Sequence, residues 1–303
     1  MVVQDCDAAY YSYSSLIQKN DVEAVEALLI NGINPNYNPR GKIKIPLIEA
    51  VISSSINVVS ILLRHRALPY LTLNGDGTAL HYAAALGHTN IVRLLIRHEA
   101  NINSPNKAGY TPLFLAIQYN HIETARHLIE MGASLHAQCK ETALTLASYA
   151  GHYQLVKTIT SKVPNEEKDQ KREYYVALSQ ASFKGFTRII KLLLRLGADV
   201  NASYEGVSPP LFASIYGNRV ITARYLISKN ANIEARNQGG YTPLMEAAKR
   251  GHEGMMKILL DAGADTNAKS LIEKETAYEF AQSGKFHDVC VLLAKHNIKE
   301  HAI

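Results

Sequence analysis

The sequence is poor in cysteine, has no tryptophan and contains no long apolar run. Its three cysteines, Cys6, Cys139 and Cys290, stand far apart and form no CxxC pair. This spacing argues against a disulfide framework or a cysteine-based zinc site, and it favours a reducing, cytoplasmic compartment. Because no stretch of about 18 apolar residues occurs, we expect no membrane insertion. The first residues carry Asp5 and Asp7 without a basic start, so no signal peptide is expected.

Catalytic motifs are also missing. The chain has no GxSxG elbow, no phosphate-binding glycine loop, no HExxH and no paired Cys–His nucleophile motif. Cys139 is the one candidate for an exposed thiol, whereas Cys290 lies in an apolar phrase and is expected to be buried. We therefore expect a protein that is not an enzyme and that holds no metal and no cofactor.

Charge is modest for a chain of 303 residues, of which 47% are hydrophobic and 19% are charged. The formal net charge of +5 makes the chain mildly basic. Such a balance requires no nucleic-acid partner. About 300 residues would normally form two or more globular domains, but a repeat array escapes that limit because its core grows along one axis.

What the chain does have is an internal repeat. A tripeptide slot recurs with separations of 33, 33, 31, 34, 33, 33 and 34 positions between its middle residues. The eight occurrences are Ile45-Pro46-Leu47, Thr78-Ala79-Leu80, Thr111-Pro112-Leu113, Thr142-Ala143-Leu144, Val176-Ala177-Leu178, Pro209-Pro210-Leu211, Thr242-Pro243-Leu244 and Thr276-Ala277-Tyr278.

The chemistry of the slot predicts a helix start. Thr111 and Thr242 can cap a helix by accepting a backbone N–H, and Pro112 and Pro243 suit the first helical position. Glycines then end the helices: Gly87, Gly151 and Gly251 break the first helix of a unit, and Gly132, Gly197 and Gly263 suit a left-handed cap after the second.

Period and motif together resemble the ankyrin repeat, whose signature is T-P-L-H-x-A over about 33 residues. The fullest match runs from Gly77 through Ala84, followed by Gly87-His88. The resemblance implies an all-α ankyrin-repeat solenoid, in which helix-turn-helix units stack and project β-turns. It also implies a single domain over 1–303. The expected repeats are 5–38 (a degenerate cap), 41–73, 74–106, 107–138, 139–163, 164–204 (an irregular helical start), 205–237, 238–270 and 271–303 (a cap).

The centre of the array departs from the pattern. The turn at 138–141 should be short, and the stretch 164–173 lacks both the glycine and the Thr-Pro start. Its composition favours a helical extension into the sixth unit after Pro164. Two interpretations stay open: simple repeat decay, or a bend or partner-specific feature that separates units 1–5 from units 6–9.

The ankyrin resemblance implies a binding surface on the exposed ends of the first helices and on the turn tips. In this sequence the helix-end positions are Tyr82, Leu86, Gln118, Tyr119, Tyr149, Phe183, Lys184, Tyr216, Lys249 and Arg250, and the tips add Tyr110, Tyr204 and Tyr241. Tyrosine suits a binding hot spot because it offers a large contact area at low entropy cost. The basic members point to an acidic or mixed partner surface. The alternative is that these rings only pad neighbouring helices.

Other repeated positions have simpler interpretations. The basic ladder Arg93, Arg126, Lys157, Lys191, Arg224 and Lys257 could track phosphate groups, but the slot is commonly basic in the ankyrin family and faces solvent. His81, His88, His121, His152 and His252 are expected to hydrogen-bond turns. Asn201 resembles ankyrin asparagines that an oxygenase hydroxylates, although it could equally stabilise its own turn.

Taken together, these patterns predict a non-enzymatic scaffold or adaptor that binds a partner protein through the concave groove and the β-turn tips, and that is a monomer when unbound. Two alternatives stay open. One is an effector that an intracellular microbe delivers into a host cell. The other is a regulatory subunit of an enzyme supplied by another chain.

Overall fold

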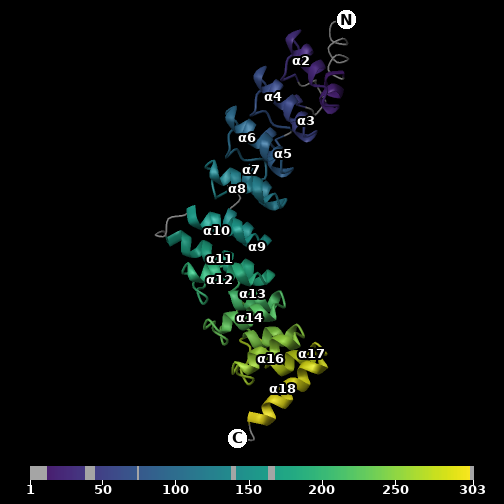
Figure 1. Ribbon diagram of the computed structural model, residues 1–303. Coiled ribbons are helices and arrows are strands. Elements are labelled where there is room, and N and C mark those ends of the chain that lie inside the picture. Colours follow the sequence, from purple (N-terminus) through teal and green to yellow (C-terminus); the bar gives the residue numbers. More distant parts are fainter. Residues whose placement is uncertain (1–11, 38–44, 74, 138–140, 163–167, 301–303) are drawn as a thin grey trace. The chain divides into compact units, whose positions relative to one another are not determined.

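The computed structural model describes residues 12–37, 45–73, 75–137, 141–162 and 168–300, which are helical apart from turns and two isolated β-bridges (Figure 1). No β-strand occurs within these ranges, and the predicted all-α fold class is confirmed. By its contacts the chain divides into two compact units, Met1–Leu146 (unit 1) and Ala147–Ile303 (unit 2).

Unit 1 consists of helix pairs in two layers. After a helical segment at residues 12–18 come α2 (Val22–Ile30), α3 (Pro46–Ile52), α4 (Ile56–Arg64), α5 (Ala79–Ala85), α6 (Thr89–Arg97), α7 (Pro112–Gln118), α8 (Ile122–Glu130) and the start of α9 (Ala143–Ala150). The first helices α3, α5 and α7 contact one another in order, and so do the second helices α2, α4, α6 and α8. Each repeat therefore packs on its neighbours in both layers.

Unit 2 repeats this plan. Its helices are α10 (Tyr153–Lys162), α11 (Lys168–Lys184), α12 (Thr187–Arg195), α13 (Pro210–Tyr216), α14 (Val220–Ile227), α15 (Pro243–Lys249), α16 (Glu253–Asp261), α17 (Ala277–Ser283) and α18 (His287–Glu300). The first-helix layer runs α11, α13, α15, α17, and the second-helix layer runs α10, α12, α14, α16, α18.

The irregular centre lies partly outside the described residues. Positions 138–140 of the expected short turn, which include Cys139, are not among the described residues, and neither are positions 163–167 of the junction. From Lys168, however, the stretch is helical, and α11 has 17 residues where the other first helices have seven or eight. The expected repeat boundaries remain predictions.

The helix starts follow the predicted chemistry at one of the two threonines. Thr242 Oγ1 accepts the backbone N–H of Met245 at 3.4 Å, and Pro243 stands at the first helical position. Pro112 holds the equivalent place in α7, but Thr111 makes no capping hydrogen bond, so that prediction is wrong. The Thr111 hydroxyl is buried and has no hydrogen-bond partner among the described residues.

The glycines that end the first helices serve two purposes. Gly151 has a φ of +84°, a left-handed conformation that glycine adopts without strain. A Cβ at this position would also stand 2.5 Å from Phe186 Cζ in the next repeat. Gly251 shows the same relation to Phe286. The residue after one helix break thus packs onto the glycine of the preceding break, and the repeats can approach closely only because that Cβ is missing.

The core is aliphatic and follows the repeat. Leu95 in α6 and Leu259 in α16 occupy the same position, and both are fully buried. Cys290 in α18 is only half-buried, contrary to expectation, because α18 belongs to the terminal repeat. Interior burial is set by repeat position, whereas a terminal helix lacks one neighbour.

Candidate protein-binding surface

The predicted binding residues all reach the surface at least in part. Six of them are half-buried: Tyr82, Tyr110, Lys184, Tyr204, Tyr216 and Tyr241. The other seven are exposed: Leu86, Gln118, Tyr119, Tyr149, Phe183, Lys249 and Arg250. We call the exposed ends of the first helices, with their turn tips, the first-helix face, and we describe it separately for each unit.

In unit 2 this face consists of aromatic rings that carry cations. Lys184 Nζ lies 4.3 Å from the centroid of the Tyr149 ring. The Arg250 guanidinium lies 4.7 Å from the Tyr216 ring, and Lys249 Nζ lies 4.4 Å from the Tyr241 ring. At these distances the cation is attracted by the negative face of the ring. The structure therefore brings predicted aromatic and basic residues together as pairs, of which the first two join neighbouring repeats.

A buried carboxylate, which the sequence analysis did not single out, organises the middle pair. Glu246 in α15 accepts hydrogen bonds from Arg250 Nε at 2.8 Å and from Asn237 Nδ2 at 3.1 Å. Asn237 Nδ2 also donates to the Tyr216 hydroxyl at 3.2 Å. The signal that could have found this site is the Glu246–Arg250 spacing, because residues four apart on a helix lie side by side.

Tyrosine ionisation on this face is suppressed. Burial raises the pKa of Tyr216, and at Tyr241 the hydrogen bond from its hydroxyl to Glu273 raises the pKa. The Tyr241 ring also packs edge-on against Phe280, with 5.3 Å between centroids. Both tyrosines therefore present neutral hydroxyl groups that are held in fixed positions.

Tyr204 is used differently from the other predicted tip residues. Its ring lies 5.0 Å from the Tyr175 ring of α11, between centroids. Burial raises the pKa of Tyr175 to about 12. Tyr204 thus packs against a neighbouring helix, as the alternative interpretation of these rings supposed, and it is half-buried.

In unit 1 the first-helix face is uncharged and mostly apolar at the equivalent helix ends. Ile52, Leu86 and Tyr119 are all exposed large hydrophobic residues. Burial, with a smaller contribution from Asp76, raises the pKa of the half-buried Tyr82. Ile52 was not among the predicted residues, although it precedes the helix break at the slot that Gln118 and Tyr149 fill.

Two of the predicted histidines stabilise turns in unit 1. The Thr78 backbone N–H donates to His81 Nδ1 at 3.1 Å, so the ring's other nitrogen, Nε2, donates to the Tyr110 carbonyl oxygen at 3.2 Å. Burial lowers the pKa of His81, which favours this neutral form. His88 shares a hydrogen bond of 2.9 Å with Ser54 Oγ in the preceding repeat. Within the described ranges no group of three or more His, Cys, Asp or Glu side chains is placed to hold a metal ion.

Asn201 connects two repeats. Its Nδ2 donates to the Asn230 carbonyl oxygen at 2.8 Å, and its Oδ1 accepts the Asn232 backbone N–H at 2.8 Å. Asn36 makes the same pair of bonds to Arg66 and Leu68 in unit 1. The side chain therefore has a structural role, and its modification remains a prediction.

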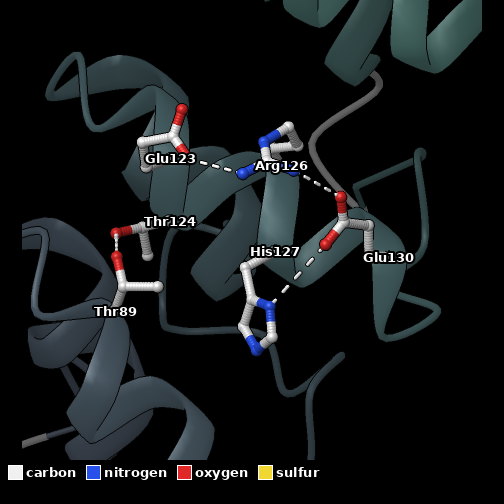
Figure 2. Close-up of polar contacts among 6 residues, drawn as sticks. All are labelled: Thr89, Glu123, Thr124, Arg126, His127 and Glu130. Atoms are coloured by element: carbon white, nitrogen blue, oxygen red, sulfur yellow. Dashed lines mark hydrogen bonds and ion pairs between the residues drawn. The ribbon is translucent and has the colours of Figure 1, made fainter.

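The basic ladder lies on the second helices and is solvent-exposed. In α8, Arg126 donates to Glu123 Oε2 at 2.6 Å and to Glu130 Oε1 at 2.7 Å, while the adjacent Thr124 hydroxyl meets Thr89 Oγ1 of α6 at 2.7 Å (Figure 2). The two carboxylates also raise the pKa of Arg126. In unit 1 this rung of the ladder is therefore compensated by acids.

Comparison with known proteins identifies the repeats. The family model described as ankyrin repeats (3 copies) matches residues 14–106, 68–139, 101–172 and 178–270, which together take in most of the chain. The structure is similar to that of the human ASB11 ankyrin repeat domain, with a TM-score of 0.63 and 21% sequence identity. The match covers 72% of this chain and 98% of the ASB11 chain. This likeness concerns the fold alone.

Two curated relatives are similar in sequence to parts of this chain. Delta-latroinsectotoxin-Lt1a of Latrodectus tredecimguttatus is 32% identical over 123 residues, which are 40% of this chain and 10% of the toxin. The probable E3 ubiquitin-protein ligase XBOS32 of Oryza sativa subsp. japonica is 28% identical over 222 residues, which are 72% of this chain and 37% of the ligase. The chain therefore spans well under two thirds of either relative.

No helix among the described residues is long and apolar enough to cross a membrane. Ankyrin repeats are protein-interaction modules, generally without enzymatic activity, and they bind other proteins. The family match, the paired-helix repeats and the confirmed fold class agree with the sequence motif. The chain belongs to the ankyrin-repeat family.

Proposed function

We propose that this chain is a non-enzymatic scaffold that binds a partner protein through the first-helix face of unit 2, and that it does so in the cytoplasm. The observation that carries the proposal is the set of three ring–cation pairs on this face: Tyr149 with Lys184, Tyr216 with Arg250, and Tyr241 with Lys249. Tyrosine and arginine are the residue types over-represented at binding hot spots.

The charges of this face indicate the partner's chemistry. Lys184 has no ion-pair partner among the described residues, whereas Arg250 is paired with the buried Glu246. Lys249 lies near enough to Glu273 to help lower the pKa of that carboxyl, after the larger effect of the hydrogen bond from Tyr241. A segment with one or more carboxylates beside apolar side chains complements this mixture. The rings supply apolar contact, and the cations set the preference for acids.

Selection from a displayed peptide library tests the proposal. We expect peptides that bind the wild type to be enriched in Asp and Glu. The variant Tyr149→Ala/Lys184→Ala should bind them at least about tenfold more weakly, since each half of a hot-spot pair contributes on the order of 1 kcal/mol or more. The matched control is Tyr153→Ala/Arg188→Ala, which removes a ring–cation pair of 4.6 Å from the second-helix layer of the same unit.

Both variants should keep the wild-type circular dichroism spectrum. Peptides that lose affinity for the first variant alone support the first-helix face. Peptides that bind both variants equally, or that show no acidic enrichment, would refute the proposed surface.

The setting of the scaffold defines two further candidates. One is an effector delivered by an intracellular microbe, which a translocation assay would test; a composition rich in Ile, Asn and Tyr and free of Trp is typical of an AT-rich genome. A regulatory subunit of an enzyme is the other candidate. Because one relative is a probable E3 ubiquitin-protein ligase, ubiquitin ligation is the first activity to assay in any partner that co-purifies with the chain.

A further inference from the structure

The second-helix layer of unit 2 carries a concentration of positive charge. Helices α10, α12 and α14 contact one another in order. They and the two residues after α14 contain no Asp or Glu, and they carry seven exposed basic side chains: Lys157, Lys162, Arg188, Lys191, Arg195, Arg224 and Lys229. Among the described residues, no carboxylate forms an ion pair with any of the seven. We call these residues the basic face.

Two tyrosines lie within the basic face, and both hold cations. The Arg188 guanidinium lies 4.6 Å from the Tyr153 ring centroid. The Tyr225 ring has Lys191 Nζ at 5.3 Å and Lys229 Nζ at 5.7 Å. Both rings are half-buried. The aromatic faces are therefore used to fix the positions of cations and are not offered as free platforms for stacking.

The charges extend in two dimensions. Along α12, Arg188 and Arg195 are seven residues apart, which corresponds to about 10 Å of helix. Across the layer, Lys157, Lys191 and Arg224 occupy the same position in three packed helices, and neighbouring axes are typically 8–10 Å apart. Near one edge of this array stands Ile221, the most exposed large hydrophobic residue described, at 78%.

We propose that the basic face docks on an anionic lipid surface, as a peripheral contact that leaves the first-helix face free for a protein. A two-dimensional array of uncompensated cations complements a two-dimensional array of phosphate headgroups better than it complements a single strand. The exposed Ile221 beside these cations suits the boundary between headgroups and acyl chains. Single-stranded nucleic acid would instead require free aromatic platforms along one groove.

Co-sedimentation with vesicles tests the inference. We expect the whole chain to bind phosphatidylcholine vesicles that contain about 30% phosphatidylserine and not to bind pure phosphatidylcholine vesicles, because the attraction depends on the surface potential. Binding should fall steeply as salt rises from about 50 to 300 mM. The variant Lys157→Gln/Arg224→Gln should bind about 25-fold more weakly, since each basic residue contributes about fivefold.

Two controls separate this surface from general charge and from other polyanions. Arg93→Gln/Arg97→Gln removes two exposed cations from α6 of unit 1 and changes the net charge equally, so its vesicle binding should stay near that of the wild type. Ile221→Ser should weaken binding to vesicles severalfold but leave binding to a single-stranded oligonucleotide unchanged.

Three results would overturn the inference. One is no binding to phosphatidylserine vesicles at low salt. Another is an equal loss in both double variants, which would indicate net charge alone. The third is oligonucleotide binding that is tighter than vesicle binding and is lost in Lys157→Gln/Arg224→Gln, which would assign the basic face to nucleic acid. A failed peptide selection at the first-helix face would leave all three measurements unaffected.

Discussion

The two units are built on one repeat, yet their surfaces differ in charge. The second helices of unit 1, α2, α4, α6 and α8, carry four acidic and four basic residues. In unit 2, helices α10, α12 and α14 carry six basic residues and no acid, whereas α16 and α18 carry three basic and four acidic residues. The first-helix faces differ in the same direction, because unit 1 presents Ile52, Leu86 and Tyr119 where unit 2 presents rings with cations.

What this difference teaches is that fold and surface are specified by separate positions. Leu95 and Leu259 fill the same buried site in the two units. Gly87 in unit 1 and Gly251 in unit 2 each lie against an aromatic ring of the next repeat. These positions fix the stacking of repeats. The exposed positions between them tolerate an apolar, an aromatic or a charged side chain without changing the backbone, so each unit can acquire its own partner.

The largest expected effect comes from a charge placed in the shared core. Leu95→Asp in unit 1 and Leu259→Asp in unit 2 each bury a carboxylate without a partner, and we expect each to cost more than about 4 kcal/mol and to unfold the surrounding repeats. Stability in a repeat array is mainly a sum of nearest-neighbour terms, so the other unit should stay folded. Circular dichroism should show a partial loss of helix in each variant.

Leu94→Asp is the control for the first of these changes. Leu94 is half-buried, although its place in the apolar phrase Ile91-Val92-Arg93-Leu94-Leu95 predicts a core position. Its substitution should therefore be milder than that of Leu95. Full unfolding of the whole chain by either core variant would show that the two units fold as one cooperative body.

The next effect compares the two kinds of ion pair. Glu246→Gln removes the charge from a carboxylate that is 7% exposed and paired with Arg250, so we expect a loss of about 1–3 kcal/mol. Glu123→Gln in unit 1 removes a carboxylate that is 75% exposed, and there we expect at most about 0.5 kcal/mol. Urea denaturation of both variants measures the difference. Equal losses would mean that the Glu246 network adds nothing beyond an ordinary surface pair.

The fold could be predicted from the sequence because the signals of the ankyrin repeat are local. Thr-Pro starts, left-handed glycines and apolar spacing recur every 31 to 34 residues, and each position repeats its role. The Thr111 cap failed because capping depends on the rotamer and distance of one hydroxyl. Glu246 was missed because its importance comes from Asn237 and Tyr216, which the fold brings together from another repeat. The charge of the basic face was visible in the sequence as a ladder of basic residues, but the two tyrosines that hold its cations were not.

A smaller effect concerns pH. His81 in unit 1 and Met245 in unit 2 fill the same slot, and both accept the backbone N–H of the threonine that precedes their helix. Burial lowers the pKa of His81 in the folded chain below its ordinary value of 6.5, so below that pH the unfolded state binds more protons. The contribution of His81 to stability is therefore complete above about pH 6.5 and is lost as the pH falls through the folded pKa.

The matched variant is His81→Met, which copies the residue of unit 2. We expect the melting temperature of the wild type to fall more steeply between pH 7 and 5 than that of the variant, as thermal melts at several pH values would show. His88 and His252, whose pKa values burial also lowers, will leave some pH dependence in both proteins. Identical slopes would mean that His81 does not sense pH through this cap.

The smallest expected effect on stability tests whether the ring–cation pairs of unit 2 contribute mainly to folding or mainly to binding a partner. Lys184→Gln removes the cation above Tyr149 on a surface where such a pair contributes about 0.5–1 kcal/mol, so the melting temperature should fall by only about 1–4 °C. Affinity for acidic peptides should fall by about tenfold or more, because there the same charge meets a partner's carboxylate out of water. A cation that mattered mainly for packing would give the reverse ratio. In that case the charge difference between the two units would reflect how their repeats are held together, and not what they bind.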